Sequence, residues 1–253
     1  MNYIGIDIGS TSAKTVVMNE EKEIIFKSVI PTGWSSVDTA EYIKSHLIEK
    51  GITKENSKIV ATGYGRVSVP YADKTYTEIT CHGKGAVYIY EDSCTVIDIG
   101  GQDTKVINLE GGVVTDFIMN DKCSAGTGRF LEIMANTLGV SLNELSSLAK
   151  NGKGVSISSM CTVFAESEVI SLIGAGTKRE DIAFGITDSI VNKVKAICFK
   201  QRNTGNYYLT GGLCENQFIL ESLSRKLEAE VKAKPLGRYA GAIGAALMCE
   251  KLK

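Results

Sequence analysis

The chain has 253 residues, long enough to bury a hydrophobic core as one large domain or two small ones without disulfides. Its 28 lysine and arginine residues nearly balance 29 aspartate and glutamate residues, so no overall charge would attract nucleic acid or an anionic membrane. The chain shows no secretory signal and no apolar stretch near the roughly 20 residues of a membrane span, which predicts a cytoplasmic protein.

The first half of the chain predicts a β-β-β-α-β order. The sequence YIGIDIGSTSAKTVVM places two β-branched runs on either side of a polar turn, as in a hairpin. EIIFKSVI predicts a third strand, VDTAEYIKSHLIEKG a helix that ends at Gly51, and KIVATGYGR a strand followed by a glycine turn.

The second half repeats the hairpin pattern in TVIDIGGQDTKVINL, with Asp98 in the position of Asp7. GGVVTDFIMN then predicts a third strand, and NYYLTGG predicts a later strand after three helices. The predicted helices cover residues 128–138, 161–172 and 179–201.

The tail YAGAIGAALMCEKLK predicts a helix whose glycines allow close approach to a neighbouring backbone or a ligand. We expect this helix to pack on the first half of the chain. The repeat therefore predicts two domains, one of residues 1–92 with 240–253 and one of residues 93–239.

Three glycine turns at strand ends predict a nucleotide site. The first, DIGSTSAK, offers backbone N–H groups and hydroxyls to phosphates, with Lys14 as a positive charge and Asp7 for a hydrated Mg²⁺. A lone Asp-x-Gly turn more often has a purely backbone role. The repetition in DIGGQD and the glycines of LTGG favour a nucleotide in a cleft between the two halves.

This pattern resembles the actin, sugar-kinase and heat-shock ATPase superfamily. The resemblance implies an α/β fold, with two tandem ribonuclease-H-like domains around an ATP cleft. It implies phosphate loops at residues 7–14 and 98–103, an adenosine segment at residues 210–212 and a connecting segment at residues 241–245. Neither a P-loop nor a G-x-G-x-x-G motif occurs, so the commoner nucleotide folds do not compete.

The candidate residues of this site fall into two groups. Those expected to bind the nucleotide are Gly9, Ser10, Thr11, Ser12, Lys14, Asp98, Gly100, Gly101, Gly126, Thr127, Gly128, Gly211, Gly212 and Gly241. Asp7 and Asp103 suit the Mg²⁺–water network, and Gln102 or Glu166 would orient the attacking water. Glu166 is equally well explained as a glutamate that interacts with the dipole in the first turn of a helix.

Seven cysteines, an odd number without C-x-x-C pairs, argue against a disulfide framework. Cys123 in MNDKCSAGTGRF and Cys161 in SSMCTVFAESEVISL each precede a predicted helix, where N–H groups and the helix dipole favour a thiolate. Packing is the commoner role of an isolated cysteine. We assign Cys81 to packing, because it would point away from the adjacent His82 on a strand.

Two thiolates supply half of the ligands of a cubane iron–sulfur cluster. Such a cluster would therefore have to be shared between two identical chains, which predicts a homodimer.

Several segments together look like the activator component of the 2-hydroxyacyl-CoA dehydratases, whose near relatives are ATPase subunits of benzoyl-CoA reductase and reductases of double-cubane-cluster proteins. They are DIGGQDTKVI, MNDKCSAGTGRFLE, CTVFAESEVISL, TGYGR and ADKTYTEITCHGKGA, and the resemblance extends over nearly the whole chain. It implies one [4Fe–4S] cluster that bridges a homodimer through Cys123 and Cys161 of each chain, besides ATP and Mg²⁺.

The family's activity is the ATP-driven transfer of a low-potential electron from ferredoxin or flavodoxin to an iron–sulfur partner enzyme. In this interpretation the turn SAGTGR senses phosphate, and one helix links it to the cluster ligand Cys123. Ser124 stands where we expect alanine in many relatives, and its hydroxyl would add a hydrogen bond to a cluster sulfur.

Two other functions fit the superfamily. A small-molecule kinase would need a catalytic carboxylate and a substrate pocket, and 253 residues leave little room for the insertions that such kinases carry. A regulator or filament-forming ATPase would contain no metal, and its nucleotide state would control assembly. The acyl-CoA of an acceptor enzyme is not encoded in this chain.

Overall fold

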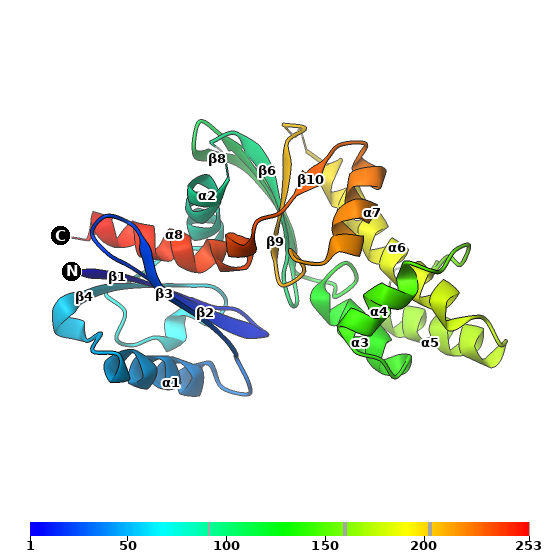
Figure 1. Cartoon of the computed structure of the whole chain (residues 1–253), viewed down its shortest axis with the longest axis horizontal. Helices are drawn as coiled ribbons and strands as arrows, with labels where there is room; N and C mark the ends of the chain where they lie inside the picture. The colour runs from blue at the N-terminus through cyan, green and yellow to red at the C-terminus, as the bar shows by residue number, and fades with distance from the viewer. Residues whose placement is uncertain (91, 159–160, 202–203, 253) are drawn as a thin grey trace. The chain divides into compact units, whose positions relative to one another are not determined.

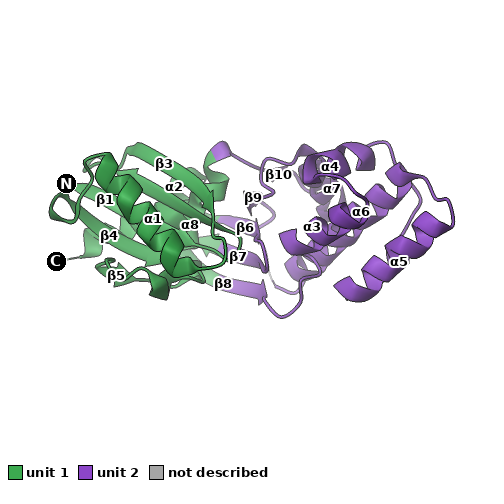
Figure 2. Cartoon of the chain, turned by 90° about the horizontal axis from the view of Figure 1, so that it is seen from below, with its two compact units in different colours: residues 1–93, 109–115, 236–253 green, residues 94–108, 116–235 purple. Residues whose placement is uncertain are grey.

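The computed structural model describes residues 1–90, 92–158, 161–201 and 204–252. The chain divides into two compact units (Figure 2). Unit 1 consists of residues 1–93, 109–115 and 236–253, and unit 2 consists of residues 94–108 and 116–235.

Unit 1 contains a five-stranded mixed sheet in the order β3-β2-β1-β4-β5 (Figure 1). β1 pairs antiparallel with β2 and parallel with β4, which confirms the predicted hairpin and the β-β-β-α-β order. The elements are β1 (Asn2–Ile8), β2 (Ser12–Met18), β3 (Ile24–Pro31), α1 (Ser36–Glu49), η1 (Lys54–Asn56), β4 (Ser57–Thr62), η2 (Arg66–Ser68), β5 (Lys74–Thr75), α2 (Glu78–Ile89), α8 (Ala240–Met248) and η4 (Cys249–Lys251).

The alternation of side chains along β1 decides what each face of this sheet carries. Ile4, Ile6 and Ile8 belong to a core with apolar residues of α1. Gly5 and Asp7 lie on the other face, because successive strand residues point to opposite sides. There a Cβ atom on Gly5 would overlap the backbone carbonyl of Ala242 in α8. The predicted close packing of the tail helix is therefore observed, within the first unit.

The structure corrects the expectation for Cys81 and His82, which lie on helix α2 and not on a strand. Two glycines inside α2 lower its intrinsic helix propensity, which conceals the helix in the sequence. Close packing against neighbouring segments explains why these two positions are glycine. A Cβ atom on Gly83 would overlap Val114, and one on Gly85 would overlap the carbonyl of Ala240 at the start of α8.

Unit 2 contains strands of a sheet with the order β10-β9-β6-β7-β8, in which β6, β9 and β10 run parallel. Helices α3 to α7 share one hydrophobic core with β6, β7 and β9. The elements are β6 (Cys94–Ile99), β7 (Thr104–Glu110), β8 (Val113–Asn120), α3 (Gly128–Thr137), α4 (Leu142–Ala149), α5 (Thr162–Gly174), α6 (Arg179–Cys198), β9 (Tyr207–Gly211), α7 (Gln217–Leu227) and β10 (Val231–Lys232), and η3 (Pro235–Tyr239) leads into α8.

The predicted strands and the three predicted helices of the second half are confirmed, whereas α4 and α7 were missed. Both begin with a local signal. Ser141 and Glu144 form a reciprocal capping box at α4, and the Asn216 side chain accepts a hydrogen bond from the N–H of Ile219 at α7. These polar caps identify helix starts that the apolar pattern alone did not.

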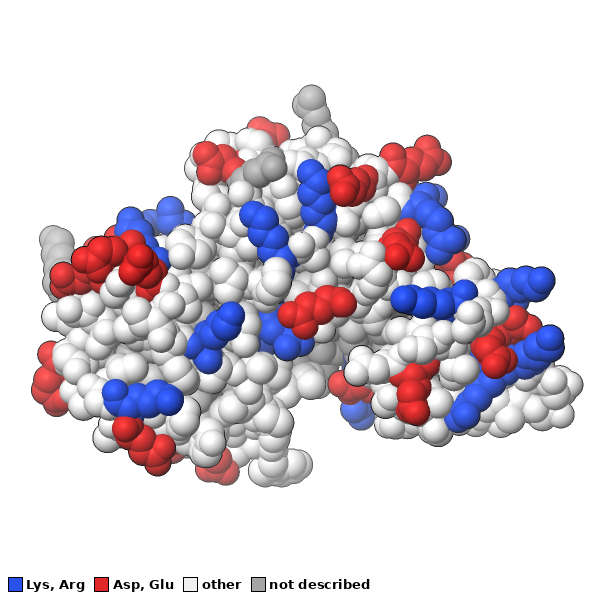
Figure 3. Space-filling model, viewed as in Figure 1, with Lys and Arg blue, Asp and Glu red and all other residues white. Residues whose placement is uncertain are grey.

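The surface agrees with the balanced composition. On the face drawn in Figure 3, lysine and arginine side chains are interspersed with aspartate and glutamate side chains. Among the helices of the described residues, none combines the length and apolar character needed to cross a bilayer.

The packing of α8 predicts a strong effect of one added methyl group. A Cβ atom on Gly244 would overlap the backbone carbonyl of Cys81, which cannot move without shifting α2. We expect Gly244→Ala to lower the free energy of unfolding by more than about 2 kcal/mol in urea titrations. Gly174→Ala is the matched control, because Gly174 has open space around it. Equal stability of the two variants would contradict this account of α8.

Candidate active site

The first predicted phosphate loop is the turn between β1 and β2 in unit 1. The N–H of Gly9 donates to the carbonyl of Ser12 across the turn, at 3.1 Å. Thr32, directly after β3, donates two hydrogen bonds to carbonyls of this loop. Its hydroxyl donates to the Gly9 carbonyl at 2.7 Å, and its N–H donates to the Thr11 carbonyl at 3.0 Å. The Lys14 ammonium donates to the Ser12 carbonyl at 3.3 Å, so this charge lies at the loop.

Asp7 lies next to this loop, with each carboxylate oxygen against a glycine. A Cβ atom on Gly63, which follows β4, would overlap Asp7 Oδ1. A Cβ atom on Gly241, in the first turn of α8, would lie 2.5 Å from Asp7 Oδ2. The structure thus brings the predicted residues Asp7 and Gly241 together. Gly63 lies in TGYGR but was not among the predicted site residues.

The second predicted phosphate loop is the turn between β6 and β7 in unit 2. The N–H of Gly100 donates to the carbonyl of Asp103 at 2.9 Å, and a Cβ atom on Gly100 would overlap Asp103 Oδ1. Gln102 is exposed within this turn. Glycine is therefore required at position 100 for the turn to close over the Asp103 side chain.

A buried lysine ties this turn to the sheet. The ammonium of Lys105 lies 2.8 Å from Asp103 Oδ2 and 3.3 Å from Asp98 Oδ2, although the lysine side chain is only 1% exposed. Sequence reasoning missed Lys105. The available signal was a single charge within TKVINL, a run that is otherwise uncharged and apolar or neutral polar.

The predicted adenosine segment contacts the same carboxylate. The Thr210 hydroxyl on β9 donates to Asp98 Oδ1 at 3.0 Å. Gly211 has a positive φ of 82°, and a Cβ atom there would lie 2.8 Å from Asp98 Oδ1. Gly212 is exposed and has open space around its Cα. Residues 98–105 and 210–211 are therefore one connected set of contacts in unit 2.

The cysteine segments also meet in unit 2. Cys161 is the exposed N-cap residue of α5, and Cys123 is half-buried in the turn before α3. The hydroxyls of Ser124 and Thr162, the residues that directly follow the two cysteines, lie 2.8 Å apart. One hydroxyl proton is used within this pair, so the structure assigns to Ser124 a protein partner that the sequence did not predict.

The cysteine turn is bonded to the second phosphate loop. At the start of α3, the N–H of Gly128 donates to the Gly100 carbonyl at 2.9 Å, and that of Arg129 donates to the Gly101 carbonyl at 2.8 Å. The Thr104 hydroxyl donates to the Gly126 carbonyl at 2.6 Å. The N–H of Gly128, one of the predicted nucleotide-binding residues, thus joins the turn to the loop, together with that of Arg129.

The structure does not bring Glu166 to this loop. The Thr137 hydroxyl, on the last residue of α3, donates to Glu166 Oε1 at 3.0 Å. The 10 residues of α3 extend over about 15 Å, and the second phosphate loop is bonded to the opposite end of the helix. Gln102 is therefore the better placed of the two candidates for orienting a water molecule at this loop.

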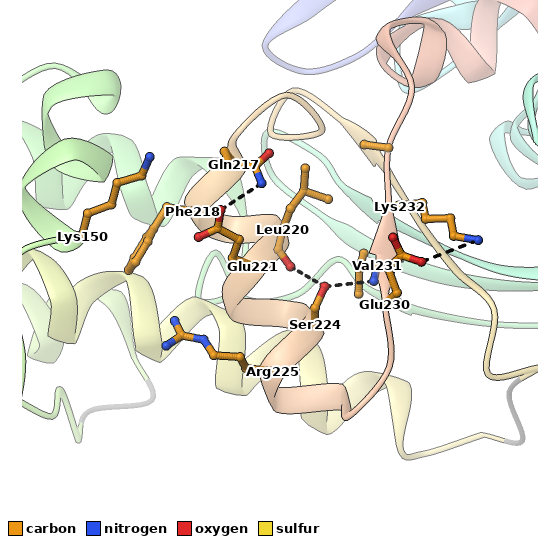
Figure 4. A pocket seen from close by; sticks show the side chains of 11 residues that line it. Lys150, Gln217, Phe218, Leu220, Glu221, Ser224, Arg225, Glu230, Val231 and Lys232 are labelled. Carbon is orange, nitrogen blue, oxygen red and sulfur yellow. Dashed lines mark hydrogen bonds and ion pairs between the residues drawn. The ribbon is translucent and has the colours of Figure 1, made fainter.

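A groove of about 910 Å³ lies elsewhere in unit 2, between α7 and β10 (Figure 4). Lys150, Arg225 and Lys232 line it together with acidic and apolar side chains. Its polar groups pair with one another: Gln217 donates to Glu221 at 2.9 Å, and the Ser224 hydroxyl accepts from the N–H of Val231 at 2.9 Å. None of the predicted site residues lines this groove.

Removing the Lys105 charge should lower stability, because it leaves the buried Asp98 and the partly buried Asp103 carboxylates without this counterion. We expect Lys105→Met to lower the free energy of unfolding by about 3–5 kcal/mol. Lys22→Met removes an exposed lysine that pairs with Glu250 at 2.9 Å, and should cost less than about 1 kcal/mol. Urea unfolding of both variants measures the difference, and equal losses would contradict the assignment of Lys105 as a buried anchor.

The thiols should differ sharply in reactivity. Burial raises the pKa of the Cys81 thiol to about 11 and that of the Cys198 and Cys249 thiols to about 12. Cys94 and Cys214 are also buried.

We therefore expect iodoacetamide at pH 8 to alkylate Cys123 and Cys161 of metal-free native protein, and all seven cysteines in urea. Peptide mass spectrometry locates the modified residues. Early modification of Cys81 in the native protein would contradict the burial order.

Comparisons with known proteins show the family of this chain. The family described as BadF/BadG/BcrA/BcrD ATPase matches residues 4–249. The (R)-2-hydroxyglutaryl-CoA dehydratase activating ATPase of Acidaminococcus fermentans is 45% identical over 251 residues, which cover 98% of this chain and 96% of that protein.

Solved structures show the same fold. The activator of the 2-hydroxyisocaproyl-CoA dehydratase from Clostridium difficile, with bound ADPNP, has a TM-score of 0.91 and 38% identity and covers 99% of this chain and 95% of its own. A ROK-family glucokinase from Streptomyces griseus, covering 99% of this chain and 100% of its own, has a TM-score of 0.62 at 14% identity and so shares the fold alone. The predicted actin-like ATPase fold is confirmed, and the chain belongs to the BadF/BadG/BcrA/BcrD ATPase family.

Proposed function

We propose that this protein is an ATP-hydrolysing activator that transfers a low-potential electron from ferredoxin or flavodoxin to an iron–sulfur enzyme such as a 2-hydroxyacyl-CoA dehydratase. It acts in the cytoplasm as a homodimer, with one [4Fe–4S] cluster held by Cys123 and Cys161 of each chain. The observation that carries the proposal is the joint attachment of the cysteine segments. The turn that contains Cys123 is bonded both to the second phosphate loop and, through Ser124, to the segment of Cys161.

The nucleotide would be held by the two phosphate loops and the adenosine segment of an actin-like fold. In this proposal Lys14 neutralises phosphate charge, Asp7 and Asp103 hold water molecules of Mg²⁺, and Gln102 orients the attacking water. The glycines packed against the carboxylates of Asp7 and Asp103 support these roles, because they place no side chain of their own against these oxygens. The relative from Clostridium difficile was solved with ADPNP, which supports nucleotide binding here.

The cysteines fit the donor set of a shared cluster. A cubane cluster takes four thiolates, and Cys123 and Cys161 supply two accessible ones from each chain. Helix α5 starts directly after Cys161 and carries four exposed apolar side chains that a second chain would cover. They are Val163, Phe164, Ile170 and Ile173.

The bound cluster would supply one-electron transfer at low potential. The protein's own residues would connect that chemistry to the nucleotide. A shift of Gly100 and Gly101 against a bound phosphate would pull on Gly128 and Arg129 at the start of α3. Through Gly126 the same shift would reach the cysteine turn. We also propose that residues 1–92 with 240–253 and residues 93–239 form the two predicted ribonuclease-H-like domains.

The proposal is tested on protein purified without oxygen. We expect about four iron and four sulfide ions per dimer, and an electron paramagnetic resonance signal of the reduced protein that changes when MgATP is added. Cys123→Ala and Cys161→Ala should each lose the iron. Cys198→Ala is the matched control, because it removes a buried thiol of the same unit.

Iron-free protein after anaerobic reconstitution would contradict the proposal. Iron bound by a monomer, or iron retained in both cysteine variants, would also contradict it. ATP consumption that depends on an added small metabolite and persists in both cysteine variants would favour a kinase instead.

A further inference from the structure

The residues that directly follow Cys123 and Cys161 are joined by their hydroxyls. Ser124 Oγ and Thr162 Oγ1 lie 2.8 Å apart, and Thr162 is only 7% exposed. We infer that this hydroxyl pair is a positioning device, which holds Cys123 and Cys161 of one chain as a two-thiol ligand before any metal arrives. The inference deepens the proposed function and rests on it, but its test needs no cluster.

Each cysteine segment is also held separately by its own contacts. On the side of Cys123, the Asn120 side-chain amide donates to the carbonyls of Cys123 and Ala125, at 2.9 and 3.1 Å. On the side of Cys161, its carbonyl accepts the N–H of Ala165 at 2.9 Å, as the start of α5 requires. These contacts shape each segment. The hydroxyl pair links one segment to the other, at a position one residue from each cysteine.

Pre-joining the segments matters because a metal site is more effective when its ligands need no ordering on binding. Cys161 is exposed, and the Cys123 carbonyl accepts a hydrogen bond from Asn120 at the end of β8. Without the hydroxyl pair, the start of α5 and the turn that contains Cys123 would lose the contact nearest the two thiols, and the thiols would be held less closely in one arrangement.

The two hydroxyls form one interaction, so removing either should have the same effect as removing both. Thr137 provides a matched control. Its hydroxyl also connects α3 with α5, at 3.0 Å from Glu166, but at the end of α3 that lies far from the cysteines. Ser124→Ala, Thr162→Val and the double variant should therefore behave alike, and Thr137→Val should behave as the parent protein does.

The test uses metal-free, reduced, full-length protein and dibromobimane, which becomes fluorescent once it has alkylated two thiols. Each alkylation forms a carbon–sulfur bond and releases bromide and a proton. We expect the parent protein to give a rapid product within one chain, which links Cys123 to Cys161 and migrates as a single chain on a denaturing gel.

The three hydroxyl variants should form this product at least tenfold more slowly. Single alkylation by iodoacetamide should be unchanged in all of them, which separates positioning from reactivity. Circular dichroism and thermal unfolding verify that each variant is folded.

The inference is overturned if Ser124→Ala and Thr162→Val form the product as fast as the parent protein. It is also overturned if the parent forms none, or forms only a product that joins two chains. No iron takes part in this test. If the intrachain product forms as expected but the protein stays iron-free after reconstitution, the cluster proposal is contradicted and the positioning of the two thiols still holds.

Discussion

The ion pairs of the buried Lys105 ammonium are the contact on which the second predicted phosphate loop depends. Taking this charge out of water is costly, and the carboxylates of Asp98 and Asp103, at 3.3 and 2.8 Å, offset the cost. Asp98 lies near the end of β6 and Asp103 just before β7, so the two ion pairs fix the turn between these strands. Through the Thr210 hydroxyl, Asp98 also contacts β9, which carries the predicted adenosine segment.

The loop fixed in this way is also the surface on which α3 starts. The first N–H groups of a helix have no partner within the helix, and here the carbonyls of Gly100 and Gly101 accept two of them. A turn that contacts phosphate in the proposed function is therefore continuous, through hydrogen bonds, with the turn that contains Cys123. In the proposed function, the phosphate contact and the cluster ligand are therefore connected within unit 2 by a few hydrogen bonds.

Unit 1 places its candidate catalytic carboxylate against glycines. Asp7 is buried, and its two oxygens face the Cα atoms of Gly63 and Gly241. Those glycines belong to the turn after β4 and to α8, which also packs on Gly5 of β1 without any intervening side chain. The small residues of α8 thus serve both the packing of the unit and the space around its candidate catalytic carboxylate.

The sequence by itself determined the two hairpins, the glycine turns after their first strands, the tail helix and the positions of two cysteines ahead of helices. These features are local, because strand periodicity, turn residues and helix ends are encoded within a few neighbouring residues. Helix α2 was hidden, since its interior glycines are explained only by contacts with Val114 and α8. Tertiary structure alone decided that Lys105 pairs with Asp98 and Asp103, that Ser124 meets Thr162, and that Glu166 binds Thr137 at the far end of α3. Ser124 and Thr162 lie 38 residues apart and Thr137 and Glu166 lie 29 residues apart, whereas Lys105 is near both of its partners in the chain. In each case a single sequence carries no signal for which polar group will satisfy another.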